Sequence, residues 1–83
     1  MTFSIVACDL ETQSFGVAVA SKFLAAASVV SWARADGGAV ATQALARVSF
    51  GPDGLSMMTA GKTAQETLSA LLAADPGQDR RQV

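Results

Sequence analysis

The sequence predicts an α+β fold in which antiparallel strands come first and a pair of helices follows. Near the N-terminus, apolar and polar residues alternate with a period of two, which is typical of strands half-buried in a sheet. Segments rich in glycine, serine and aspartate then separate further short apolar runs. Beyond residue 50, leucines recur at the spacing of one helix face. Strands followed by helices with one apolar face indicate a layered α+β domain.

Four strands are expected in the first half of the chain. Residues 2–8 and 15–21 predict two strands of a hairpin, joined by the polar segment 9–14. Residues 28–32 and 39–43 suit a third and a fourth strand, with the glycine-containing segment 34–38 between them. The alanine-rich segment 23–27 is ambiguous, since alanine favours helix.

Two helices are expected in the second half. Gly51–Gly54 opens the first helix, and Gly61 can end it as the residue after its C-cap. Thr63 and Glu66 have the spacing of a capping box for the second helix, which Asp75–Gly77 ends. The apolar stripe expected on this second helix consists of Ala64, Leu68, Leu71 and Leu72.

Composition excludes several classes of function. Six basic and seven acidic residues nearly cancel, which argues against a nucleic-acid partner. With no histidine and one cysteine, Cys8, the chain lacks zinc-ligand spacing, and we expect neither a metal nor a cofactor. Lys22 interrupts the apolar run 15–33, which argues against a membrane span. The unpaired Cys8 favours a reducing compartment, so we expect a cytoplasmic protein.

Other conspicuous residues have plain structural interpretations. Cys8 alternates with apolar neighbours and is interpreted as an inert core thiol. Trp32 is expected to be a core anchor. Arg80 and Arg81 are interpreted as a solvated pair.

Length and the last residues lead to a further expectation. Eighty-three residues suffice for one small domain, and residues 78–83 look like the approach to another strand. We therefore expect residues 1–83 to form a single incomplete domain, the N-terminal fragment of a longer one. A short protein with a frayed tail is the alternative.

Thr2 is the main candidate for catalysis. Removal of Met1 would give Thr2 a free α-amine next to its own hydroxyl. An α-amine with a pKa of about 7.7–8.0 can act as the base that a weakly acidic hydroxyl needs. The alternative interpretation is that Thr2 is simply the first residue of a strand.

Five stretches of the chain together are similar to one known family. They are Thr2–Ala7, Gly16–Phe23, Gly38–Gln43, Leu71–Gly77 and Arg81–Val83. In these stretches the chain resembles DUF1028, an uncharacterised bacterial family assigned to the N-terminal-nucleophile (Ntn) hydrolase fold. The resemblance covers the whole chain in order but only the N-terminal part of the longer family members. It implies the N-terminal part of a four-layer αββα sandwich, with a terminal threonine, here Thr2, presented at the sheet edge.

The resemblance also implies roles for individual residues. Thr2 would be the nucleophile, with Ser21 and Lys22 close to it, and the Lys22 ammonium would favour the unprotonated α-amine. Gly38, Thr42 and Gln43 are candidates for oxyanion or substrate binding. The sequence departs from the family pattern at Cys8, at Ser31 and over residues 47–50, which puts conserved specificity and activity in doubt.

Two hypotheses about function follow, and a third is weaker. The first is a hydrolase acting on an amide or related acyl bond of an unidentified small-molecule or peptide-like substrate. The second is a catalytically silent binding or assembly module on the same fold. The third is a homo-oligomer formed through unpaired strand edges. The state of the N-terminus separates the first two, because only the hydrolase needs a free Thr2 amine.

Overall fold

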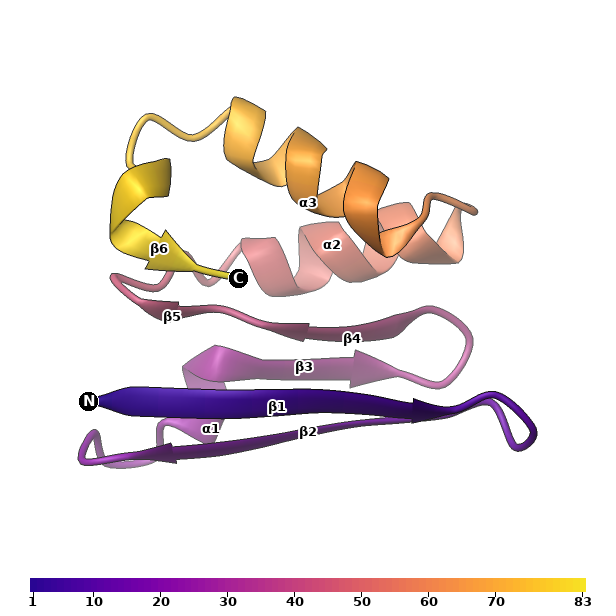
Figure 1. Ribbon diagram of the computed structural model, residues 1–83, viewed down its shortest axis with the longest axis horizontal. Coiled ribbons are helices and arrows are strands. Elements are labelled where there is room, and N and C mark those ends of the chain that lie inside the picture. Colours follow the sequence, from indigo (N-terminus) through magenta and orange to yellow (C-terminus); the bar gives the residue numbers. More distant parts are fainter.

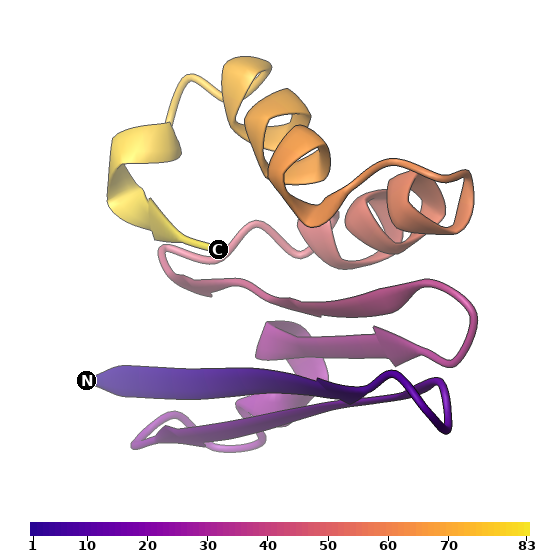
Figure 2. The same ribbon diagram turned by 45° about the vertical axis from the view of Figure 1, so that its right-hand side comes forward.

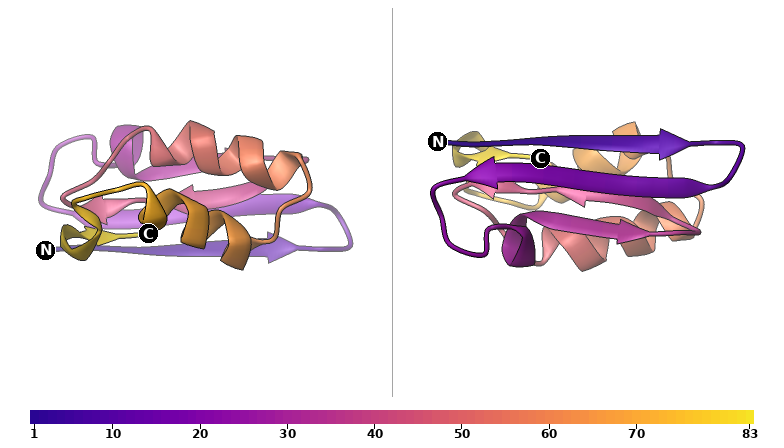
Figure 3. Two further views of the ribbon diagram at one scale, coloured as in Figure 1. Left: turned by 90° about the horizontal axis from the view of Figure 1, so that it is seen from above. Right: turned by 90° about the horizontal axis from the view of Figure 1, so that it is seen from below.

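The computed structural model describes all of residues 1–83 and arranges them in three layers (Figures 1 and 2). One antiparallel ribbon packs against a second, α2 (Phe50–Thr59) covers the far side of the second ribbon, and α3 (Ala64–Ala73) packs beside α2 (Figure 3). The α+β class is therefore confirmed. The first ribbon consists of β1 (Thr2–Asp9) and β2 (Ser14–Ser21), and the second of β3 (Ser31–Arg34) and β4 (Gly38–Ala41).

The β1–β2 hairpin follows the predicted alternation. Its register pairs Thr2 with Ser21 at one end and Asp9 with Ser14 at the other. Thr2 and Ser4 point toward the second ribbon and are partly covered. Phe3 and Ile5 point away from it and are 64% and 65% exposed. The outward face of the hairpin is therefore an uncovered apolar surface.

The third predicted strand is wrong in its first half. Residues 27–30 form a single helical turn, α1 (Ala27–Val30), and β3 begins only at Ser31. The Ser28 hydroxyl donates to the carbonyl of Ala25, which has a left-handed φ of 56°. The Ser31 hydroxyl donates to the Ala27 carbonyl. Such side-chain bonds to nearby carbonyls compete with a strand ladder, which explains the difference.

The fourth strand is shorter than predicted. β4 ends at Ala41, and residues Gln43–Ala44 form a separate strand, β5, which pairs with β6 (Arg81–Gln82). A short 3₁₀ turn, Gln78–Arg80, leads into β6. The strand is interrupted at Thr42, and the end of the chain then pairs with β5, where Gln43 donates to Gln82 (Figure 1).

Two glycines allow α2 to pack closely on the second ribbon. A Cβ atom at Gly51 would lie 2.3 Å from the Trp32 ring, and one at Gly54 would lie 3.0 Å from a methyl group of Val40. Trp32 and Val40 are cross-strand partners, so both glycines meet the same face of the ribbon. The expected role of Trp32 in packing agrees with this contact.

The end of α2 and the start of α3 both follow local sequence signals. Gly61 has a φ of 103°, its N–H donates to the Met58 carbonyl, and the Lys62 N–H donates to the Met57 carbonyl. This is the glycine-terminated helix end that the sequence predicts. The capping box at the start of α3 is also confirmed. The Thr63 N–H donates to Glu66 Oε1 at 2.9 Å, and the Glu66 N–H donates to Thr63 Oγ1 at 3.1 Å.

The apolar stripe of α3 is only partly as predicted. Leu71 is buried and Leu68 and Leu72 are half-buried, but Ala64 is exposed. Thr67 is buried instead, and its methyl group lies next to Gly54 of α2. Neither α2 nor α3 has the length and apolarity of a membrane-crossing helix.

Candidate functional site

The open end of the β1–β2 hairpin brings two hydroxyl groups together. Thr2 and Ser21 are the last cross-strand pair of the hairpin, and their Oγ atoms lie 2.7 Å apart. Ser21 Oγ also accepts a hydrogen bond from the Phe23 N–H at 3.1 Å. The residue before this pair, Met1, is fully exposed. Period-two alternation of the strands suffices to turn both hydroxyls to the inner face.

The side-chain amide of Gln43 fixes the backbone at Thr2. Gln43 is 8% exposed, and its Nε2 donates to the Thr2 carbonyl oxygen at 2.9 Å. The same Nε2 donates to Gln82 Oε1 at 2.7 Å, and Gln43 Oε1 accepts from the Ser4 hydroxyl at 2.6 Å. One buried amide therefore joins β1, β5 and β6, and both of its N–H donors are in use.

A cavity lies beside the two hydroxyls. Its volume is about 430 Å³, and Thr2, Ser21 and Gln43 line it together with seven apolar residues. One of these, Ala44, follows Gln43 with a left-handed φ of 66°. An alanine held in this region is strained, and such strain is frequent at ligand-binding sites.

The other three predicted site residues, Lys22, Gly38 and Thr42, do not line this cavity. Lys22 lies in the bend after β2, is exposed, and takes part in no hydrogen bond or ion pair. Gly38 begins β4, at the far end of that strand from Gln43, and packs near Met58. Thr42 is fully buried, with its N–H donating to the Val30 carbonyl.

Thr42 instead anchors the loop that leads to α2. Its Oγ1 accepts a hydrogen bond from the Arg47 N–H at 3.4 Å. Thr42 therefore has a structural role near the cavity. The predicted roles of Lys22, Gly38 and Thr42 in catalysis or oxyanion binding stay predictions.

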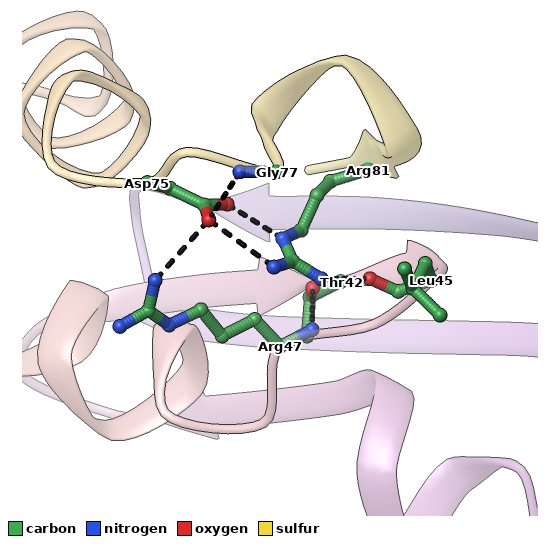
Figure 4. Close-up of polar contacts among 6 residues, drawn as sticks. All are labelled: Thr42, Leu45, Arg47, Asp75, Gly77 and Arg81. Carbon is green, nitrogen blue, oxygen red and sulfur yellow. Dashed lines mark hydrogen bonds and ion pairs between the residues drawn. The ribbon is translucent and has the colours of Figure 1, made fainter.

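A buried carboxylate next to β6 was missed from the sequence (Figure 4). The Asp75 side chain is fully buried and receives two hydrogen bonds from Arg81, at 2.5 and 3.1 Å. Arg47 and the Gly77 N–H donate to it at 3.2 and 3.0 Å. Hydrogen bonds from Arg81 are the main cause that lowers the pKa of Asp75 to about 2. The same contact raises the pKa of Arg81.

This cluster corrects two interpretations of the sequence. Arg81 is not a solvated residue, because it is held against Asp75 and donates to the Leu45 carbonyl at 2.5 Å. Asp75 is more than part of a helix stop, because it ties the end of α3 to β6. The cluster therefore positions Gln82 next to Gln43.

A third interpretation of the sequence is wrong as well. Cys8 is exposed and is not a core thiol.

The arrangement at Thr2 can support nucleophilic chemistry at a hydroxyl. Thr2 Oγ1 has a hydroxyl neighbour within hydrogen-bond distance, a backbone held by a buried amide, and an adjoining cavity. A nucleophile of this type also needs a base, which a free α-amine at Thr2 would supply. No three histidine, cysteine, aspartate or glutamate side chains gather where a metal ion would bind.

Comparison with known proteins places the chain in a family. The model of DUF1028, a family of unknown function, matches residues 2–83. The crystal structure of protein SPO2555 from Silicibacter pomeroyi, described with the same family model, is similar with a TM-score of 0.89 and 28% sequence identity. The match covers 96% of this chain and 36% of that one, so this chain spans little more than a third of its solved relative. No curated protein matches the chain.

Proposed function

The chain belongs to the DUF1028 family, and from this premise we propose that it carries the nucleophile of an Ntn-type hydrolase that cleaves an amide or related acyl bond. The nucleophile is Thr2, exposed at the N-terminus after Met1 is removed in the cytoplasm. The observation that carries the proposal is the position of Thr2 Oγ1, 2.7 Å from Ser21 Oγ and beside a cavity of about 430 Å³.

The proposed reaction uses groups of Thr2 itself. Thr2 Oγ1 attacks the acyl carbon, and its proton passes to the free α-amine of the same residue. The bond between the acyl carbon and the leaving nitrogen then breaks, and that nitrogen takes the proton from the α-amine. Water then attacks the acyl carbon of the resulting Thr2 ester, and the α-amine takes a proton from it. The bond from the acyl carbon to Oγ1 breaks, Oγ1 receives that proton, and the acid is released. Each step conserves charge, and the only reactants besides Thr2 are the amide and water.

Ser21 and Gln43 have different parts in this proposal. The Ser21 hydroxyl contacts the reacting oxygen directly, so it orients Oγ1 and can pass a proton. Gln43 does not contact Oγ1 and acts as a positioning residue through the Thr2 carbonyl. Fixing the nucleophile before the substrate arrives avoids the entropy cost of orienting it during the reaction.

The four-layer αββα sandwich is part of the same proposal. Three layers are present, and the outward face of the hairpin with Phe3 and Ile5 is apolar and uncovered. A further helical layer on this face would bury it, as the resemblance to the Ntn fold implies. The longer solved relative has the chain length for such a layer.

Covalent labelling at Thr2 tests the function. An acylating ester should modify Thr2 in the processed full-length protein, and the modification should be found on the N-terminal peptide by mass spectrometry. Thr2→Ala should abolish it, and Thr2→Ser should retain it because serine keeps a hydroxyl next to the α-amine. Labelling that survives in Thr2→Ala would favour the alternative, a catalytically silent binding or assembly module.

A further inference from the structure

The cavity beside Thr2 carries information about the substrate. Its walls contain seven apolar residues and three polar ones, Thr2, Ser21 and Gln43, and no charged residue. Phe23, which belongs to the loop after β2, and Val30 from α1 belong to the apolar part. The cavity therefore presents an apolar surface that begins at the proposed nucleophile.

The polar side chains of the cavity bond mainly to residues already present, and only one hydroxyl hydrogen of the Thr2–Ser21 pair is left over. Both N–H donors of Gln43 are used by Thr2 and Gln82. Ser21 Oγ bonds Thr2 Oγ1 and the Phe23 N–H. The Thr2 α-amine is neutral in the form that acts as base, so a charged group entering the cavity would give up water of hydration and find no counter-ion in its walls, which is unfavourable. An apolar group would lose only ordered water and gain contacts.

The nearest cationic side chain does not change this conclusion. Lys22 follows Ser21 directly in sequence, but it does not line the cavity and its side chain is exposed. It is therefore not placed to compensate a carboxylate bound inside. A volume of about 430 Å³ is enough for a small aliphatic or aromatic group.

We propose that this cavity binds the acyl side of the substrate and that the acyl group is uncharged and apolar. The inference rests on the proposed function, because it uses Thr2 as the reacting residue. Val48 is a specificity-determining position in this proposal. It lines the cavity and is 45% exposed, so a longer side chain there can reach the cavity without being forced into the core.

The test compares three esters of p-nitrophenol that differ in charge on the acyl chain. These are the butyryl, succinyl and 4-trimethylammoniobutyryl esters, each acylating Thr2 of the processed full-length protein and releasing p-nitrophenolate. The butyryl ester should react faster than either charged ester, after correction for hydrolysis in buffer, by roughly tenfold or more, the size of effect that pocket discrimination gives. Equal or faster acylation by a charged ester would overturn the proposal.

Two lysine variants make the test specific. Val48→Lys places a cation at the cavity and should raise the rate with the succinyl ester relative to the butyryl ester. Val6→Lys is the matched control, since Val6 is 49% exposed and does not line this cavity. An equal change of preference in both variants would show that the cavity does not select the acyl group.

Binding without chemistry separates this inference from the proposed function. If no ester acylates Thr2, the hydrolase proposal fails, and Thr2→Ala is then titrated with butyramide and with succinamate while methyl NMR signals are followed. Shifts of the Val30 and Val48 methyl groups with butyramide alone would still support an apolar site. No shift with butyramide, or larger shifts with succinamate, would overturn it.

Discussion

The side chain of Gln43 donates a hydrogen bond to the carbonyl oxygen of Thr2 at 2.9 Å, although 41 residues separate the two in sequence. This contact joins the start of the first strand to β5. Through Gln82 it also reaches β6, which the ion pair of Arg81 with Asp75 holds in place. The position of the proposed nucleophile thus depends on residues from both ends of the chain.

Gln43→Ala should destabilise the protein. The substitution leaves the Thr2 carbonyl and the Ser4 hydroxyl without their partner, and a buried unpaired polar group costs about 1–3 kcal/mol. Urea denaturation of both proteins measures the free energy of unfolding. Gln65→Ala, at an exposed position of α3, is the control and should change it by less than about 0.5 kcal/mol. Equal effects of the two substitutions would contradict the role of Gln43.

Asp75 should make stability depend on pH in the acid range. Its pKa is lowered from 3.8 to about 2 in the folded protein, so its ionised form favours folding. That contribution is fully present above about pH 5 and is lost as the pH falls toward about 2. Thermal unfolding measured between these pH values should therefore show a falling melting temperature.

Two variants isolate the part due to Asp75. Asp75→Asn should be less stable near neutral pH and should lose much of the acid-range slope. Glu66, whose pKa is lowered mainly by the Thr63 N–H, keeps its own contribution in this variant. Asp36→Asn removes an exposed carboxylate and should retain the slope. A full slope in Asp75→Asn would show that Asp75 is not its source.

Gly51→Ala should be among the most damaging small substitutions. The added Cβ would lie 2.3 Å from the Trp32 ring, so α2 or the ring must move, and such overpacking typically costs about 1–3 kcal/mol. Gly16→Ala is the matched control, because no atom lies within 4 Å of a Cβ there. Denaturation midpoints compare the two. A stable Gly51→Ala protein would contradict the close packing of α2.

Local features of the fold could be predicted from the sequence. The hairpin follows from alternation over residues 2–21, and the capping box at Thr63 and the helix end at Gly61 each depend on a few adjacent residues. Each of these signals acts through neighbours in sequence, so no knowledge of the rest of the molecule is needed.

Two kinds of feature could not be predicted: a local alternative to a strand, and contacts between residues distant in sequence. The helical turn Ala27–Val30 stands where a strand was predicted, because serine hydroxyls bind nearby carbonyls. Strand propensities do not include this competing hydrogen bonding. The burial of Asp75 depends on Arg81 and Arg47 meeting it after folding. Thr2 was predicted as a site residue, but its contact with Gln43 needed the three-dimensional arrangement.

The most direct test of the proposal is the intact mass of untagged full-length protein purified from the cytosol of its expression host. Met1 is fully exposed and therefore accessible to an aminopeptidase. We predict a mass lower by one methionine, which means that Thr2 has the free α-amine that its hydroxyl requires. A protein that retains Met1 has no such amine and would contradict Thr2 as a self-activated nucleophile.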